Sequence, residues 1–220
     1  MMYYFLHPIS SLNLLAARLV TDQITFLLSI ALFVFLSLNY KKTLWEKMDN
    51  VVAHWAENSK ETFIKKNAED FAIFGNAIFH ILLSVVLSII FFLVRHKFAS
   101  VLAIFFVLIF SWGLNRFMKL VFKRTRPEHL ASNIRRRLSY CYPSGHIMAS
   151  IPIYFFCAVL LQSLLPFLPW YLIALAISYF VIMSRIYLNH HYFTDVLGGI
   201  LMGILCLNIS IWFYFMVGLY

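Results

Sequence analysis

The chain has 220 residues, a formal net charge of +9 at pH 7 and a mean hydropathy of +0.82. Hydrophobic residues make up 62% of it and charged residues 12%, whereas a soluble domain is about half apolar and about a quarter charged. This composition excludes an ordinary soluble domain and indicates a membrane protein. The positive charge does not indicate nucleic-acid binding, because no basic face with interleaved aromatic residues lies on a soluble module. Anionic lipid headgroups are the better partner for cations at the ends of apolar helices.

Apolar segments long enough to cross a hydrocarbon core of about 30 Å recur along the chain. Pro166 and Pro169 divide one long uncharged stretch, because proline disfavours helix continuation. The fold class is therefore predicted to be all-α, a polytopic six-transmembrane-helix bundle forming one domain over residues 1–220. The spans are expected at about 23–40, 71–94, 98–122, 147–165, 170–188 and 193–219. Gly198, Gly199 and Gly203 in the last span are expected to allow close contact with neighbouring helices.

The longest polar stretch is residues 41–70, where six lysines are balanced by six acidic residues. We interpret it as a helical loop that lies on the membrane surface as a solvated cap, with lipid gathering as the alternative. The N-terminus lacks a basic region and a small-residue cleavage site, so no cleavable signal peptide is predicted and the first span is expected to be an uncleaved anchor.

Several polar or reactive side chains within the apolar segments are interpreted as structural. Cys157 and Cys206 are expected to be packing residues, and the three cysteines define no disulfide framework. Cys141 is expected to be a small loop side chain, with lining a site as the alternative. His80 shares a helix face with Asn76 and is expected to be a hydrogen-bonded interior histidine.

Three short polar clusters stand at the ends of apolar segments. They are Lys119 to Arg126-Pro127, then Pro143-Ser144-Gly145-His146, then Ser184-Arg185 to His191 and Asp195. An even number of spans puts both termini on one side of the membrane and all three clusters on the other. The clusters are therefore predicted to form one site at a membrane interface.

The first two clusters are suited to binding and protonating a phosphate. The ammonium of Lys119 offers a point charge, and the guanidinium of Arg126 offers a planar fork that matches phosphate oxygens. Ser144 and Gly145 at a helix start leave backbone N–H groups directed at an anion. His146 titrates near neutrality and can protonate a leaving oxygen.

The third cluster pairs a histidine with a carboxylate. His191 and Asp195 are four residues apart, so on a helix their side chains are neighbours. Asp195 can accept the Nδ1 proton and leave Nε2 of His191 free to attack phosphorus. Asp195 is also the only acidic residue among the last 90, and an unpaired carboxylate in the membrane is costly. The residues alone do not decide which histidine is the nucleophile and which the acid.

The three motifs in this order resemble those of the type 2 phosphatidic acid phosphatase (PAP2) superfamily, whose pattern is K-x6-RP, PSGH and SR-x5-H-x3-D. The chain matches every defined position, over roughly residues 70–205. The resemblance implies a metal-independent lipid phosphatase with no cofactor. It implies that His191 attacks phosphorus to form a phosphohistidine, that Asp195 orients it and that His146 protonates the leaving group and then activates water. It also implies oxyanion binding by Lys119, Arg126, Ser144, Gly145 and Arg185.

The substrate is expected to be a lipid with its phosphate at the interface. Arg135-Arg136-Arg137, between the first two motifs, can hold a second phosphate or contact bulk anionic lipid. On this basis an isoprenoid diphosphate or a lipid A phosphate is favoured, with phosphatidylglycerophosphate or phosphatidic acid next.

Two signals for the membrane orientation conflict. Most Lys and Arg residues lie on the motif side, which the positive-inside rule would place in the cytoplasm. Many of them belong to the site or are matched by acids, however, and the short Arg95-His96-Lys97 turn fits the inside. Bacterial relatives of the family face the pocket outward. We therefore predict a bacterial inner-membrane protein with its site facing the periplasm or exterior.

Other functions remain compatible with the sequence. A lipid phosphotransferase can use the same phosphohistidine. A lipid transporter would place charges near the midplane, whereas here nearly all lie at span ends. A vanadate-dependent oxidase is least favoured, because those relatives are not polytopic. The sequence leaves the oligomeric state open.

Overall fold

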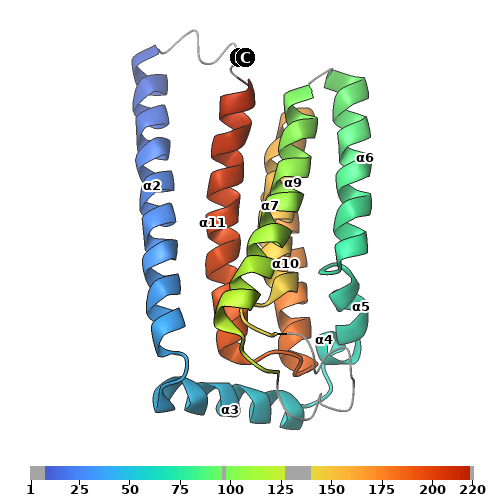
Figure 1. Ribbon diagram of the computed structural model, residues 1–220. Coiled ribbons are helices and arrows are strands. Elements are labelled where there is room, and N and C mark those ends of the chain that lie inside the picture. Colours follow the sequence, from blue (N-terminus) through green and yellow to red (C-terminus); the bar gives the residue numbers. More distant parts are fainter. Residues whose placement is uncertain (1–7, 96–97, 127–139, 219–220) are drawn as a thin grey trace.

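The computed structural model describes residues 8–95, 98–126 and 140–218, with side chains from residue 23 onward except those of Arg95 and Gly218. Regular secondary structure within these ranges is entirely helical (Figure 1). Five helices are long and apolar enough to cross a membrane, which confirms the predicted all-α membrane fold. They are α6 (Ala77–Arg95), α7 (Phe98–Phe122), α9 (Gly145–Leu164), α10 (Trp170–Tyr187) and α11 (Phe193–Gly218).

The first predicted span belongs to a longer helix. This helix, α2, begins at Pro8 and ends at Asn39, and it packs against α11 along the bundle (Figure 1). The next helix, α3 (Thr43–Asn58), is bent from Gln23–Asn39 by 94° and lies across one end of the bundle. Residues 23–39 and 43–58 pass the criterion for a broken span only as a pair. The described residues therefore hold five candidate spans, or six if this bent pair counts as one.

Residues 41–70 form helices, as predicted. They contain α3, α4 (Phe63–Lys66) and α5 (Ala68–Ile73). Helix α3 packs against α10 and α11, and its Asp49 and Ala56 are buried. The solvated cap stays a prediction for α3, most of which is exposed, while its inner face contacts the bundle.

The predicted span 71–94 is interrupted near its start. Helix α5 ends at Ile73 and α6 begins at Ala77. The intervening backbone approaches α9 closely: a Cβ on Gly75 would lie 2.8 Å from His146 Cδ2. This break places Asn76 beside the start of α9.

Helix α9 is the centre of the bundle and contacts α6, α7, α10 and α11. Ile147, Met148, Ile153, Phe156 and Leu160 are almost fully buried on it. A helix that is apolar on all sides is expected to be enclosed by others. The surrounding helices expose large apolar side chains such as Leu38 and Ile78, which suits a surface covered by lipid.

Gly198, Gly199 and Gly203 of α11 make the close contacts that were predicted. A Cβ on Gly198 would lie 2.7 Å from the Tyr142 ring, and one on Gly199 would lie 3.0 Å from the Ser144 carbonyl oxygen. One on Gly203 would lie 3.0 Å from Ile151 Cβ. The missing side chains therefore let α11 lie directly against the start of α9.

The two ends of the bundle are formed by different helix termini. Helix α2 starts and α11 finishes at one end, and α3 and the starts of α9 and α11 lie at the other (Figure 1). This arrangement confirms that the polar clusters share one end.

Candidate active site

His191 and Asp195 lie at the start of α11 and are both buried. Nδ1 of His191 is 3.3 Å from Oδ2 of Asp195. A carboxylate can only accept a hydrogen bond, so Nδ1 carries the proton and Nε2 keeps its lone pair. The same Oδ2 accepts the backbone N–H of Tyr192 at 3.1 Å. His191 precedes α11, which begins at Phe193, so the pair predicted by the i, i+4 spacing forms across the start of the helix.

The second motif meets this pair through its backbone. Ser144 N donates to the Asp195 carbonyl oxygen at 3.0 Å, which joins the start of α9 to that of α11. The Ser144 side chain is buried, and within the described residues its Oγ has no hydrogen-bond partner. Buried hydroxyls are normally hydrogen-bonded, so this one is available to a further polar group such as a phosphate oxygen.

The cations of the first motif reach the same place from α7. Nζ of Lys119 would lie 3.6 Å from a Cβ on Gly145, so it points at the start of α9. Nη1 of Arg126 donates to the His190 carbonyl oxygen at 2.9 Å, in the turn between α10 and α11. Both cations act electrostatically on His191.

Arg185 and His146 complete the set. Arg185 is buried at the end of α10, and its Nε donates to Ser184 Oγ at 3.3 Å. His146, on the first turn of α9, lies within electrostatic reach of Arg185, His191 and Lys119. The structure thus brings together all eight residues selected from the sequence: Lys119, Arg126, Ser144, Gly145, His146, Arg185, His191 and Asp195.

His146 has a partner that the sequence did not reveal. Its Nε2 lies 2.9 Å from Oδ1 of Asn76. The sequence placed Asn76 with His80 on one helix, but Asn76 lies in the break before α6. His80 is an interior histidine as expected, with Nε2 3.2 Å from Ser150 Oγ.

Arg124 and Asp49 also belong to the site, although neither was predicted from the sequence. Nη1 of Arg124 donates to Asp195 Oδ1 at 2.7 Å, and its Nη2 donates to Asp49 Oδ2 at 2.8 Å. The signal for Arg124 was its position two residues before Arg126. Asp49 had no comparable signal, because it is one of six acids in a polar stretch.

Two other side chains support the start of α9. Asn115 Nδ2 donates to the Pro143 carbonyl oxygen at 3.1 Å. Sγ of Cys141 lies 3.0 Å from the Thr125 carbonyl oxygen, so Cys141 is a buried residue beside the site. Cys157 and Cys206 are buried as predicted.

Burial sets the protonation of His191. It lowers the pKa of His191 to about 4, and the Asp195 carboxylate opposes this shift only in part. The cations Arg126 and Lys119 lower the pKa further. His191 is therefore neutral at pH 7.

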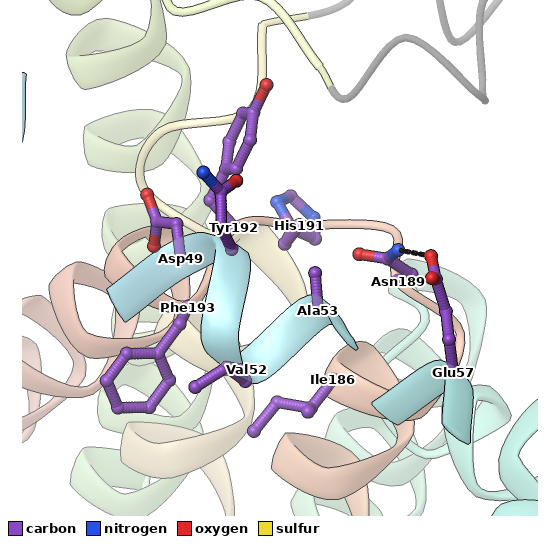
Figure 2. Close-up of a pocket in the computed structure, with 10 residues that line it drawn as sticks. Asp49, Val52, Ala53, Glu57, Ile186, Asn189, His191, Tyr192 and Phe193 are labelled. Atoms are coloured by element: carbon purple, nitrogen blue, oxygen red, sulfur yellow. Dashed lines mark hydrogen bonds between the residues drawn. The ribbon is translucent and has the colours of Figure 1, made fainter. Parts of the chain in front are cut away.

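A cavity of about 260 Å³ separates α3 from the turn that carries His191 (Figure 2). Asp49, Ala53 and Glu57 of α3 line one side. Asn189 and His191 line the other, and Asn189 Nδ2 donates to Glu57 Oε1 at 3.0 Å. His191 is thus bordered by space large enough for a small polar group.

Among the described residues, no group of three or more His, Cys, Asp or Glu side chains is placed to hold a metal ion. Arg135-Arg136-Arg137 lie outside the described residues, as do His96 and Lys97.

The fold and the site define a polytopic membrane protein with a histidine–carboxylate pair among cations at one interface. A profile of the PAP2 superfamily matches residues 99–218, and the chain belongs to this superfamily. It is 38% identical over 97 residues to phosphatidylglycerophosphatase B of Bacillus subtilis (strain 168), an alignment covering 42% of this chain. The alignment spans 47% of that relative, about half of its length.

A solved structure is similar over most of the chain. It is the crystal structure of the first transmembrane PAP2-type phosphatidylglycerolphosphate phosphatase from Bacillus subtilis. The TM-score is 0.77 at 25% identity, and the match covers 86% of this chain and 95% of the other. The bundle described above is therefore the PAP2 membrane fold.

Proposed function

We propose that the protein is a metal-independent lipid phosphatase that acts through a phosphohistidine. The observation that carries this proposal is the His191–Asp195 pair, whose Nδ1–Oδ2 distance of 3.3 Å leaves Nε2 of a neutral imidazole available. Neutral imidazole held by a carboxylate is a competent nucleophile, because the carboxylate stabilises the positive charge that develops on the ring.

In the first step Nε2 of His191 attacks phosphorus opposite the leaving oxygen. The P–N bond forms, the P–O bond to the lipid breaks, and His146 gives its proton to the leaving oxygen. In the second step a water gives a proton to His146 and attacks phosphorus. The P–N bond breaks, inorganic phosphate leaves, and both histidines return to their starting states.

The cations and the start of α9 stabilise the phosphoryl oxygens. We assign this role to Lys119, Arg126 and Arg185, and to the backbone and hydroxyl of Ser144-Gly145. Their charges are aimed at oxygens that gain charge in the transition state, and removing one contact of this kind typically lowers kcat about 10²–10³-fold. Asn76 holds one nitrogen of His146, so we assign proton transfer to the other, Nδ1.

Lipid phosphates are the proposed substrate class, because the site lies at the end of a bundle with an apolar exterior. Phosphatidylglycerophosphate is the first to test, since both relatives are named for it. Isoprenoid diphosphate and lipid A phosphate, favoured from the arginine run, belong to the same panel together with phosphatidic acid. We propose a bacterial inner-membrane location with the site facing outward.

The decisive experiment is phosphate release by detergent-purified protein with EDTA present, over this panel, beside His191→Ala. We expect release by the parent protein and a loss of at least about 10³-fold in the variant. A ³²P-labelled substrate should leave an acid-labile label on the parent protein only. Release that requires an added lipid acceptor would instead identify a phosphotransferase, and equal release by His191→Ala would contradict the assigned nucleophile.

A further inference from the structure

Arg124 is held at the junction of three elements. It follows α7, and it donates from Nη1 to Asp195 Oδ1 at 2.7 Å and to Thr194 Oγ1 at 2.6 Å on α11. From Nη2 it donates to Asp49 Oδ2 at 2.8 Å on α3. One guanidinium therefore bridges the carboxylate that orients His191 and a carboxylate from α3.

Aromatic rings fix the plane of this guanidinium. Its central carbon lies 4.6 Å from the ring centroid of Tyr40 and 4.1 Å from that of Tyr192. Cation–π contacts at these distances favour a charged arginine and resist its displacement.

Both carboxylate oxygens of Asp49 also accept hydrogen bonds from Thr194. Its Oδ1 accepts the backbone N–H of Thr194 at 2.8 Å, and its Oδ2 accepts the Thr194 hydroxyl at 2.9 Å. Asp49 is 4% exposed and Asp195 is fully buried. Through Thr194, Asp49 therefore contacts α11 one residue before Asp195.

Arg124 is the one cation that contacts both carboxylates of this cluster. Two buried carboxylates share one arginine, which a low-dielectric site tolerates because the cation lies between them. Without the cation, two buried carboxylates would face each other, and one of them would take up a proton. A protonated Asp195 would no longer hold His191 with a charged acceptor.

We propose that Asp49 and Arg124 are positioning residues for the phosphoryl transfer, holding Asp195 in the place and charge state that orients His191. This proposal rests on the proposed function. It makes α3 part of the catalytic apparatus, because that helix supplies one of the two carboxylates that bind Arg124.

The test compares Asp49→Asn, Arg124→Gln, the double variant Asp49→Asn/Arg124→Gln and the control Glu46→Gln. Glu46 is an exposed acid on α3, so its variant makes a matched change of charge. We expect kcat to fall about 10²-fold in Arg124→Gln, as misplaced catalytic groups commonly cause, with KM within about twofold of the parent. The control should retain parental kcat.

The double variant gives the sharper result. Asparagine can still accept the Thr194 N–H and removes one of the two carboxylates. The double variant should therefore be more active than Arg124→Gln alone, by about tenfold. If Asp49 and Arg124 had purely structural roles, the loss of kcat in the double variant would instead equal or exceed the two single losses combined. Arg124→Lys keeps the charge without the fork and should lie between the parent and Arg124→Gln; it also replaces Arg124→Gln if the latter does not fold.

A second measurement tests the positioning role without measuring enzyme activity. The imidazole of His191, labelled with ¹³C and assigned with His191→Gln, is titrated by NMR in each variant. The apparent pKa of the His191–Asp195 pair should rise in Arg124→Gln, because a cation is lost, and return toward the parental value in the double variant. The other groups that face the pair remain in all variants: Lys119, Arg126, Cys141, His146, Arg185 and Tyr192.

The two proposals fail in different ways. No phosphate release by the parent on any lipid would overturn the proposed function, while the titration would still support or contradict the Arg124 cluster. Parental kcat and an unshifted titration in both Arg124→Gln and Arg124→Lys would overturn the positioning role. So would a double variant less active than Arg124→Gln.

Discussion

His191 is the residue whose environment most determines the proposed chemistry. It is 5% exposed, and burial lowers its pKa to about 4. The ordinary pKa of a histidine is about 6.5. The nucleophile therefore stays deprotonated at Nε2 in mildly acidic solution, where an exposed histidine would be protonated.

The first prediction concerns the pH dependence of activity. The acid limb of kcat/KM reports ionisations of the free enzyme, so the step assigned to His191 should lie below pH 6.5, toward the pKa of about 4. Measurement of kcat/KM between pH 4 and pH 8, on a substrate of known phosphate pKa, tests this. An acid limb at the ordinary histidine pKa, assigned to His191 by NMR titration, would contradict it.

The same pKa predicts a pH dependence of stability. As pH falls below about 6.5, the unfolded state takes up a proton at this histidine first, since the folded pKa is lower. The contribution of His191 to stability is thus fully present above about pH 6.5 and is lost progressively as pH falls toward about 4. The difference amounts to about 3 kcal/mol at most. Thermal unfolding of the parent and of His191→Gln in detergent should therefore show a smaller acid loss in the variant.

Asn76 provides a prediction for the second histidine. Asn76→Ala removes the partner of His146 Nε2, and a hydrogen bond of this kind contributes about 1 kcal/mol. We expect kcat to fall about fivefold, with KM nearly unchanged. Asn58→Ala, at the exposed end of α3, is the control and should keep parental kcat. A rise in KM alone would instead assign Asn76 to substrate binding.

At the scale of elements, the close approach of α11 to the start of α9 positions the site. Gly198 allows this approach, because its Cα faces the buried Tyr142 ring. Tyr142 is itself held by a stacked contact with Tyr40 and by a hydrogen bond of 2.9 Å with Ser37 on α2. The ring therefore has little freedom to move away.

Two glycine-to-alanine variants test this packing. Gly198→Ala would place Cβ 2.7 Å from Tyr142, and overpacking a well-packed interior costs about 1–3 kcal/mol. We expect a lower Tm and lower kcat, because α11 carries Asp195. Gly113→Ala on α7 meets nothing within 4 Å and should be neutral or stabilising by up to about 1 kcal/mol. Equal Tm values for the two variants would contradict the close contact.

At the scale of the whole molecule, the two ends of the bundle can be distinguished by labelling. Lys60 lies between α3 and α4 at the motif end, and Phe167 lies between α9 and α10 at the opposite end. Both side chains are exposed, and the native cysteines are buried. If the site faces outward, a membrane-impermeant maleimide should label Lys60→Cys but not Phe167→Cys in intact cells. The reverse pattern would place the site in the cytoplasm, as the count of basic residues favours.

The class of fold, most helix boundaries and the eight residues of the proposed site could be predicted from the sequence. These follow from local properties: apolar length sets a span, proline divides one, and the i, i+4 spacing pairs His191 with Asp195. The motifs could also be recognised in the sequence because each lies next to the end of a predicted span. Their convergence then followed from an even number of spans.

Contacts between segments far apart in the chain could not be predicted in this way. The bend of 94° after Asn39 brings α3 across the end of the bundle. Asp49 of α3 thereby reaches Thr194 of α11. The break before α6 likewise brings Asn76 to His146. The local sequence does not indicate which of the six carboxylates in a polar stretch is buried and paired, because burial and charge pairing depend on how the chain folds. The residues proposed to act on the phosphate could therefore be predicted from the sequence, whereas the contacts of Asp49 and Asn76 depend on tertiary packing.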